Sequence, residues 1–123
     1  MARMLIVDDE PKVCECLKAF FSLKNLTVEC VYTGQEAIEW LMNASADVVL
    51  LDIVLPDMSG IDVLKRVKEL YPATKVIMIT ALEKSEPHHE SIAYGAFGYI
   101  RKPFDLTAVD WDPVFADLKQ PSG

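Results

Sequence analysis

Three aspartates stand directly after short apolar runs, where a group of carboxylates could bind a cation or accept a phosphoryl group. Asp8 and Asp9 follow Met4–Val7, and Asp52 follows Val48–Leu51. If these runs are neighbouring parallel strands, their carboxyl ends meet at one edge of a sheet and bring the aspartates together. Carboxylates in such a group repel one another unless a cation lies among them, and Mg²⁺ is a hard ion that takes oxygen ligands. We therefore expect a Mg²⁺ site at this edge.

Two further polar residues follow apolar runs of the same kind. Thr80 comes after Val76–Ile79, and Lys102 comes shortly after Phe97–Ile100. Each residue alone has an ordinary explanation, such as a turn residue or a solvated charge. Five polar groups at the ends of four apolar runs are harder to explain in this way, because none of them stabilises a sheet. A hydroxyl and an ammonium beside carboxylates suit phosphoryl transfer, which needs positioning and neutralisation of charge.

The elements that must position these residues follow from an alternation of short apolar runs with amphipathic stretches along the chain. This alternation indicates β-α units that build a parallel sheet. With Val28–Val31 as the second strand, we expect an α/β fold, a three-layer sandwich around a five-stranded parallel sheet of order 2-1-3-4-5. Apolar residues at helical spacing predict the core faces of the first two helices, namely Val13, Leu17, Phe20 and Phe21, and then Ile38, Leu41 and Met42.

Capping signals mark the expected helix ends. Thr33 with Glu36 fits a capping box before the second helix, and Ser59 begins the third helix in a similar way. Pro113 falls within the last amphipathic stretch, where it would cost an unbroken helix about 3 kcal/mol. We expect Asp112 and Pro113 to begin a separate short helix instead.

Charge and hydropathy limit the kinds of partner that the protein can bind. The net charge of −7 makes the surface repel phosphate backbones, and no cluster of Lys or Arg offsets it, so we expect no direct nucleic-acid binding. The N-terminus lacks a secretory signal, and no apolar stretch reaches the roughly 18 residues that span a bilayer. We expect a cytoplasmic protein without a membrane partner.

The cysteines are Cys14, Cys16 and Cys30. The first two lie on the same expected helix, two residues apart, and therefore point in different directions. The favoured interpretation is that all three are thiols in a reducing compartment that act as small apolar residues. Redox sensing is the remaining alternative.

Four segments of the chain, MLIVDDEP, LLDIVLPDMSG, VIMITA and GYIRKPF, resemble the signature blocks of the response-regulator receiver family. They occur in that family's order and spacing over about residues 3 to 106. The resemblance implies a flavodoxin-like receiver domain, which we expect over residues 1–119 with a C-terminal tail at 120–123. It also implies bacterial two-component phosphorelay signalling, with the domain assisting its own phosphorylation and dephosphorylation rather than acting as an enzyme.

The resemblance assigns roles to the acidic residues. Asp52 matches the phosphoacceptor, whose phosphoryl donor would be a sensor histidine kinase or a histidine phosphotransfer protein. Asp8 and Asp9 match the residues that hold Mg²⁺, Asp9 directly and Asp8 through water. The backbone carbonyl of Val54 matches a further ligand of the ion.

The resemblance also implies a switch. Lys102 would pair with the phosphoryl oxygens, Thr80 would bond to them once they are present, and Tyr99 would change rotamer with the state. The surface that responds would be formed by the fourth helix, expected to begin near Ser85 and Pro87, the fifth strand at Phe97–Ile100 and the last helix, expected within Asp105–Leu118. It would bind a second copy of the chain or a downstream effector.

Two alternatives use the same fold. An aspartate-based phosphohydrolase would normally carry a second carboxylate two residues after its nucleophile, where this chain has Val54, which cannot donate a proton. A nucleotide or flavin module would need a glycine- or hydroxyl-rich loop after the first strand, where this chain has Asp-Asp-Glu-Pro. A receiver domain therefore remains the main hypothesis, with the phosphohydrolase as its alternative.

Overall fold

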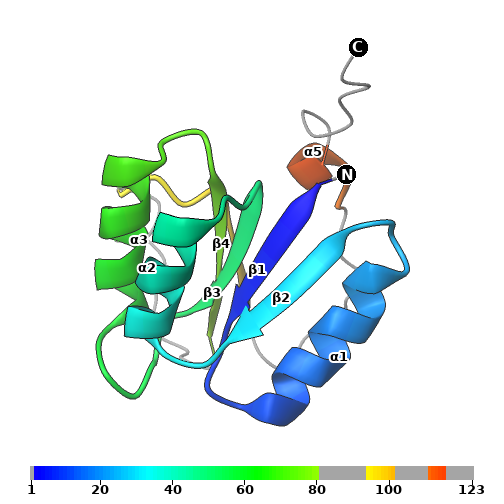
Figure 1. The fold of residues 1–123 in the computed structure, drawn as a ribbon, viewed down its shortest axis with the longest axis horizontal. Coiled ribbons are helices and arrows are strands. Elements are labelled where there is room, and N and C mark those ends of the chain that lie inside the picture. The colour runs from blue at the N-terminus through cyan, green and yellow to red at the C-terminus, as the bar shows by residue number, and fades with distance from the viewer. Residues whose placement is uncertain (1, 81–93, 102–110, 116–123) are drawn as a thin grey trace.

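The computed structural model describes residues 2–80, 94–101 and 111–115 and contains one five-stranded parallel sheet (Figure 1). The order of the strands is β2-β1-β3-β4-β5, so the predicted fold class and strand order are confirmed. The strands are β1 (Arg3–Val7), β2 (Thr27–Val31), β3 (Val48–Asp52), β4 (Lys75–Thr80) and β5 (Gly98–Arg101). The helices are α1 (Pro11–Ser22), α2 (Gly34–Asn43), α3 (Gly60–Leu70) and α5 (Asp112–Phe115).

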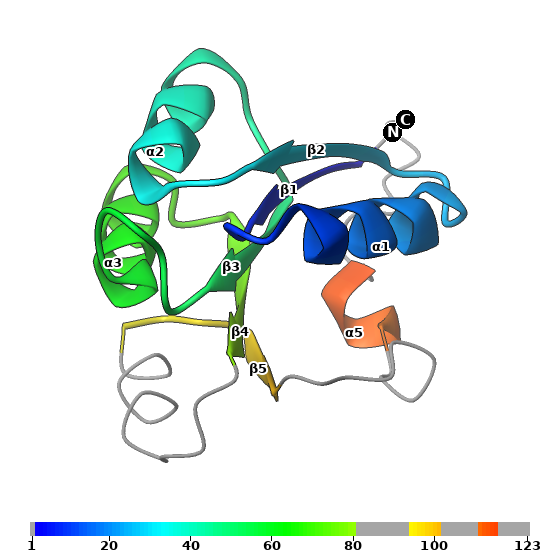
Figure 2. The same ribbon diagram turned by 90° about the horizontal axis from the view of Figure 1, so that it is seen from below.

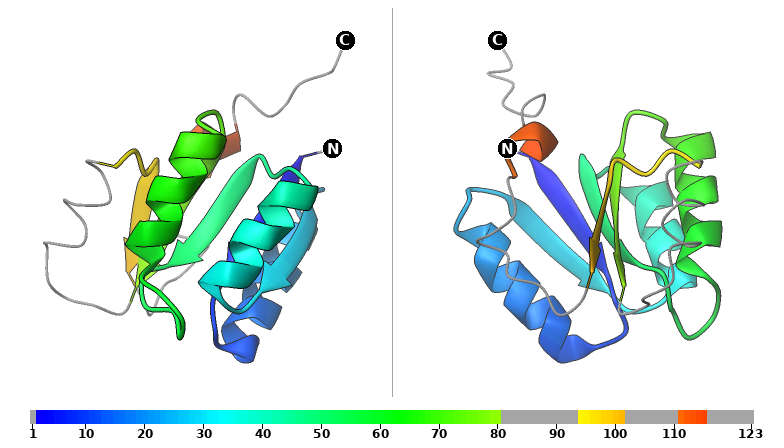
Figure 3. Two further views of the ribbon diagram at one scale, coloured as in Figure 1. Left: turned by 60° about the vertical axis from the view of Figure 1, so that its left-hand side comes forward. Right: turned by 180° about the vertical axis from the view of Figure 1, so that it is seen from behind.

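Helices cover both faces of the sheet. Figure 2 shows α2 and α3 on one face and α1 with α5 on the other, and Figure 3 shows α2 and α3 side by side. Each face has its own apolar core, one built around Leu64 of α3 and the other around Phe21 of α1. The predicted three-layer arrangement is therefore confirmed.

The central strands are buried on both faces, which explains why they read as continuous apolar runs rather than as alternating ones. Every residue of Met4–Val7 and of Val48–Asp52 is buried. Neighbouring strands are in register from Met4 opposite Val48 to Val7 opposite Leu51. This register places the residue after β1 next to the last residue of β3, at the carboxyl edge of the sheet.

Local signals place the helix ends as expected. The Thr33 side chain accepts a hydrogen bond from the Glu36 amide at 3.0 Å, and the Glu36 carboxylate accepts one from the Tyr32 amide at 2.9 Å. These two bonds provide acceptors for backbone amides near the start of the helix that have no acceptor within the helix itself. Ser59 caps α3 by accepting from the Ile61 amide at 3.1 Å.

The core face of α2 differs from the expectation at one position. Met42 is 66% exposed, whereas Ala37 and Leu41 are buried and Trp40 packs against the same core. The helical period allowed either neighbour of Leu41 to face inward, and the flat indole of Trp40 covers more of the core than the Met42 thioether would. The inclusion of Met42 in the core was wrong.

The short helix α5 starts at Asp112, as the Asp112-Pro113 pair predicts. Trp111, just before it, is buried and packs edge-on against Phe21 with ring centroids 4.8 Å apart. The Lys75 ammonium donates to the carbonyls of Pro113 at 3.2 Å and Val114 at 2.9 Å. Lys75 is the first residue of β4, so this contact ties α5 to the end of the sheet opposite the aspartates.

In the part of the chain that the structure describes, no helix combines the length and apolar character that a bilayer span requires.

Replacing Lys75 with Met should loosen α5, because Met keeps an apolar stem of similar length but donates no hydrogen bond. We expect the free energy of unfolding in urea to fall by about 1–2 kcal/mol, the usual effect of losing bonds from a charged donor. Lys12→Met, an exposed change on α1, is the matched control. Equal unfolding midpoints in the two variants would contradict a stabilising role for the Lys75 contact.

Candidate functional site

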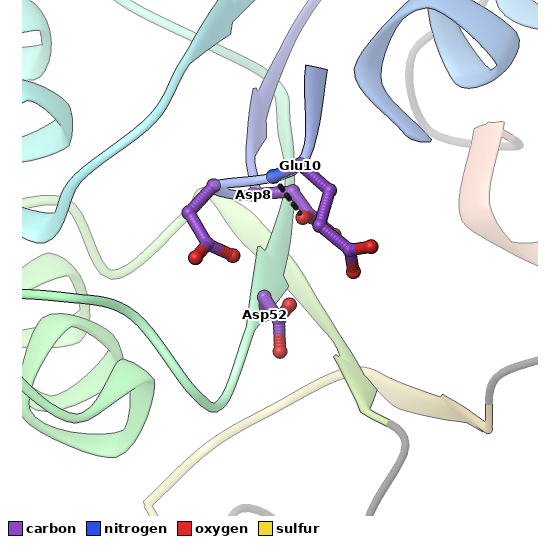
Figure 4. Close-up of side chains that lie close together, drawn as sticks. Asp8, Glu10 and Asp52 are labelled. Atoms are coloured by element: carbon purple, nitrogen blue, oxygen red, sulfur yellow. Dashed lines mark hydrogen bonds between the residues drawn. The ribbon is translucent and has the colours of Figure 1, made fainter. Parts of the chain in front are cut away.

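Four carboxylates meet at the carboxyl edge of the sheet. Ligand oxygens of Asp8, Asp9, Glu10 and Asp52 all lie within 4.8 Å of one another. Figure 4 shows Asp8 and Glu10 in the segment that follows β1 and Asp52 at the end of β3, with their side chains gathered together. This is the convergence that the strand order predicts, and Glu10 is an addition that the sequence analysis did not include.

The segment after β1 holds Asp8 through backbone groups. The Asp8 Oδ1 atom accepts a hydrogen bond from the Glu10 amide at 2.9 Å, and the Asp8 amide donates to the Val31 carbonyl at 3.2 Å. The thiol of Cys14 donates to the Asp8 carbonyl, with the sulfur 3.3 Å from the oxygen. Asp8 is fully buried, and the bond from the Glu10 amide orients its carboxylate while the other two bonds hold its backbone.

Asp52 is held in a similar way by the loop that follows it. Its Oδ1 atom accepts a hydrogen bond from the Val54 amide at 3.0 Å, and only 4% of the residue is exposed. The Gly60 amide closes the loop by donating to the Ile53 carbonyl at 2.7 Å. A Cβ atom at Gly60 would overlap the Asp52 carbonyl oxygen, so only glycine lets α3 begin this close to the end of β3.

Asp57 in the same loop caps α2 across the sheet edge. Its two carboxylate oxygens accept hydrogen bonds from the amides of Gly34 at 2.9 Å and Gln35 at 2.8 Å. These backbone bonds hold the pKa of Asp57 below its usual value. The loop after Asp52 is thereby fastened to the first turn of α2, a link that no spacing in the sequence indicates.

The donor set fits a hard divalent cation. The four residues offer carboxylate oxygens and no nitrogen or sulfur ligand, which suits Mg²⁺ better than a soft metal. Asp9 and Glu10 are exposed whereas Asp8 and Asp52 are buried, so an ion among them would contact both protein and solvent. Such an arrangement matches an ion that keeps several of its waters.

Of the other predicted site residues, the structure describes some fully, some in part and some not at all. β4 ends at Thr80, as expected, but the Thr80 side chain and all of Lys102 lie outside the described residues. Tyr99 lies in β5 opposite Met78 of β4 and packs, partly buried, against the core on the α3 side of the sheet. Val54 exposes 57% of its surface, and its backbone contacts Asp52.

Comparison with known proteins decides the family. The family model described as the response regulator receiver domain matches residues 4–110. The chain belongs to the response-regulator receiver family. It is thus a receiver domain of two-component signalling, a signalling module, and the phosphohydrolase alternative is not favoured.

Individual relatives agree with this assignment. The receiver domain is 40% identical over 104 residues to the regulatory protein AtoC of Escherichia coli K12, covering 85% of this chain and 23% of that protein. A solved CheY-like receiver domain from Methanospirillum hungatei JF-1 superposes with a TM-score of 0.82 at 31% identity, covering 98% of this chain and 92% of the other. The response regulator TrrA from Thermotoga maritima, solved in complex with Mg²⁺-BeF, superposes with a TM-score of 0.77 at 29% identity, covering 98% of each chain.

The receiver domain spans less than half the length of the curated relatives it matches, from 23% of AtoC to 48% of a staphylococcal regulator. Several of these relatives are named as transcriptional regulatory proteins. The charge argument applies to the receiver segment alone. The expectation that no nucleic acid is bound therefore has no support from the relatives.

Replacing Asp57 with Asn tests the link between the acceptor loop and α2. The native pKa of Asp57 is lowered, so its charge stabilises the fold above the unfolded value of about 4 and this contribution is lost as pH falls through the native pKa. Urea unfolding at pH 7 should show Asp57→Asn to be less stable than the wild type, with the difference shrinking below about pH 4.

Asp62→Asn, which makes the same change of charge on exposed residue 62 of α3, is the control for net charge. The free energy of unfolding of the wild type is compared with that of Asp57→Asn at each pH. If the difference between them stays constant as the pH falls below 4, the electrostatic origin of the link is contradicted.

Proposed function

We propose that Asp52 accepts a phosphoryl group from the phosphohistidine of a sensor histidine kinase or a histidine phosphotransfer protein. The observation that carries this proposal is the position of its carboxylate, which is nearly buried at the end of β3 and within 4.8 Å of the carboxylates of Asp8 and Asp9. A nucleophile in such a place is screened from bulk water yet lies beside a group that fits a cation.

The chemistry needs an ionised, oriented carboxylate. One Asp52 oxygen attacks phosphorus, the P–N bond of the phosphohistidine breaks, and its electron pair stays on the imidazole. The hydrogen bond from the Val54 amide to Asp52 Oδ1 fixes the carboxylate plane during this attack. Phosphoryl transfer depends mainly on such positioning and on neutralisation of charge, so no strong base is required.

Asp8, Asp9 and the Val54 carbonyl are the groups that would hold Mg²⁺, with Asp9 as the direct carboxylate ligand and Asp8 acting through water. The ion supplies neutralisation of the charge on the phosphoryl oxygens. The carboxylate donor set supports this proposal, and so does the Mg²⁺-BeF complex of TrrA. Glu10 adds a fourth carboxylate within reach of the ion's water shell.

The output of the reaction is a changed surface. Lys102 pairs with the phosphoryl oxygens, the Thr80 hydroxyl bonds to them, and Tyr99 changes its packing in response. Support comes from β4, which ends at Thr80, and from the packing of Tyr99 beside Met78 in the next strand. The expected fourth helix, which lies outside the described residues, would form a surface together with β5 and the last helix, and this surface would bind a second copy or an effector. The receiver domain would extend over residues 1–119 of a bacterial, cytoplasmic protein, with a tail at 120–123.

The acceptor assignment can be tested with a small phosphodonor such as acetyl phosphate. We expect a mass increase of one phosphoryl group only when Mg²⁺ is present, and no increase in Asp52→Asn. Peptide mapping after borohydride trapping locates the modified residue. Asp57→Asn is the matched control, because this aspartate lies five residues along the same loop and should leave the modification intact. A modified Asp57 or Asp62 in the Asp52→Asn variant would overturn the assignment.

The metal ligands can be separated by calorimetric titration with Mg²⁺. Asp9→Ala should lower the affinity most, because a direct carboxylate ligand is lost, by about 10–100-fold or more. Asp8→Ala should lower it less, because the proposed contact runs through water. Glu39→Ala on the exposed face of α2 is the control for charge. Equal losses of Mg²⁺ affinity in the two aspartate variants would contradict the proposed division of roles. Unchanged affinity in both variants would contradict the proposed metal site.

A further inference from the structure

Two of the three thiols lie together beneath α1. Cys14 of α1 is 1% exposed, and Cys30 of β2 is half-buried in the same apolar core. The Cys30 thiol points at the helix and donates to the carbonyl of Cys14, with the sulfur 3.8 Å from the oxygen. Cys16, by contrast, is exposed on the outer face of α1. Cys14 and Cys16 are close in the sequence, but the fold brings Cys30 next to Cys14 instead.

The surroundings of Cys30 favour its reactive form. The neighbouring Cys14 side chain is the largest influence on the pKa of Cys30 and lowers it, and the positive charge of Lys18 acts in the same direction. Burial and the negative charge of Glu29 oppose this shift, but the net pKa lies below the ordinary value. A thiolate is the nucleophile in oxidation and disulfide chemistry, so Cys30 is the member of the pair that would react first.

Because the Cys30 sulfur lies 3.8 Å from the Cys14 carbonyl oxygen and both side chains belong to the same apolar core, we propose that Cys14 and Cys30 are an oxidisable pair that a hydroperoxide converts into an intramolecular disulfide. The Cys30 thiolate attacks a peroxide oxygen, the O–O bond breaks, and Cys30 sulfenic acid and hydroxide form. The Cys14 sulfur then attacks the Cys30 sulfur, water leaves, and the S–S bond closes. The two thiols lose two electrons, which reduce the peroxide, and thiol exchange with a small reductant reverses the bond.

The bond would change the acidic site. The Cys14 thiol donates its hydrogen to the Asp8 carbonyl, and a disulfide has no such hydrogen to donate. A disulfide also holds its two Cα atoms about 4.4–6.8 Å apart, so it would constrain the position of α1 against β2. Because α1 begins at Pro11, directly after Glu10, this constraint acts close to the segment that carries Asp8. We infer that oxidation weakens Mg²⁺ binding, an inference that rests on the metal site proposed above.

The pair is tested first by its chemistry, in a Cys16→Ser chain that keeps only Cys14 and Cys30. Treatment with hydrogen peroxide should remove two titratable thiols and two hydrogens of mass. Trypsin should then release a reducible pair of linked peptides, because Lys18 and Lys24 separate the cysteines. Cys16→Ser with Cys30→Ser is the matched control and should form no link; Cys30→Ala replaces it if the serine variant does not fold. Formation of sulfinic acid on Cys30 alone, or of disulfides only between molecules, would contradict the proposed intramolecular disulfide.

The effect on the site is tested by titrating Mg²⁺ into the reduced and the oxidised Cys16→Ser protein. Loss of a group that holds a ligand in place typically costs about tenfold or more in metal affinity, and we expect a fall of that size on oxidation. Addition of a reductant should restore the affinity. Equal affinities in the two states would refute the coupling, even with the disulfide formed. Lack of Mg²⁺ binding in both states would refute the proposed metal site instead.

Discussion

The approach of four carboxylates to within 4.8 Å of one another is the constraint on which the rest of this structure depends. Like charges repel strongly at such distances, and the net charge of −7 adds to the repulsion. The fold opposes it with backbone amides, from Glu10 toward Asp8 and from Val54 toward Asp52. These amides hold the group together, and a cation would remove the remaining repulsion.

The elements around the group are arranged to keep it in place. Gly60 lets α3 start against the backbone of Asp52, and Asp57 fastens the same loop to α2. At the opposite end of the sheet, Lys75 holds α5. The central strands β1, β3 and β4 are largely buried between these two ends, so the acidic edge is supported by rigid elements rather than by loops alone.

Much of this arrangement follows from local sequence signals. Apolar runs bounded by polar residues predict the strands, Thr33 and Ser59 predict helix starts, and the strand order brings Asp8 to Asp52. The contacts that sequence does not reveal depend on side chains from distant elements. Cys14 meets Cys30, and Asp57 meets α2, only after the sheet has formed. Periodicity also could not tell Met42 from Trp40, because both flank the buried Leu41.

The most direct measurement of the central claim is a crystal structure of the protein grown with Mg²⁺ and beryllofluoride, which mimics a phosphoryl group. We expect beryllium bonded to an Asp52 carboxylate oxygen, with Mg²⁺ contacting Asp9, Asp52 and the carbonyl of Val54. Beryllofluoride bound at any other carboxylate, or an Asp52 that stays unmodified beside a well-ordered Mg²⁺, would contradict it.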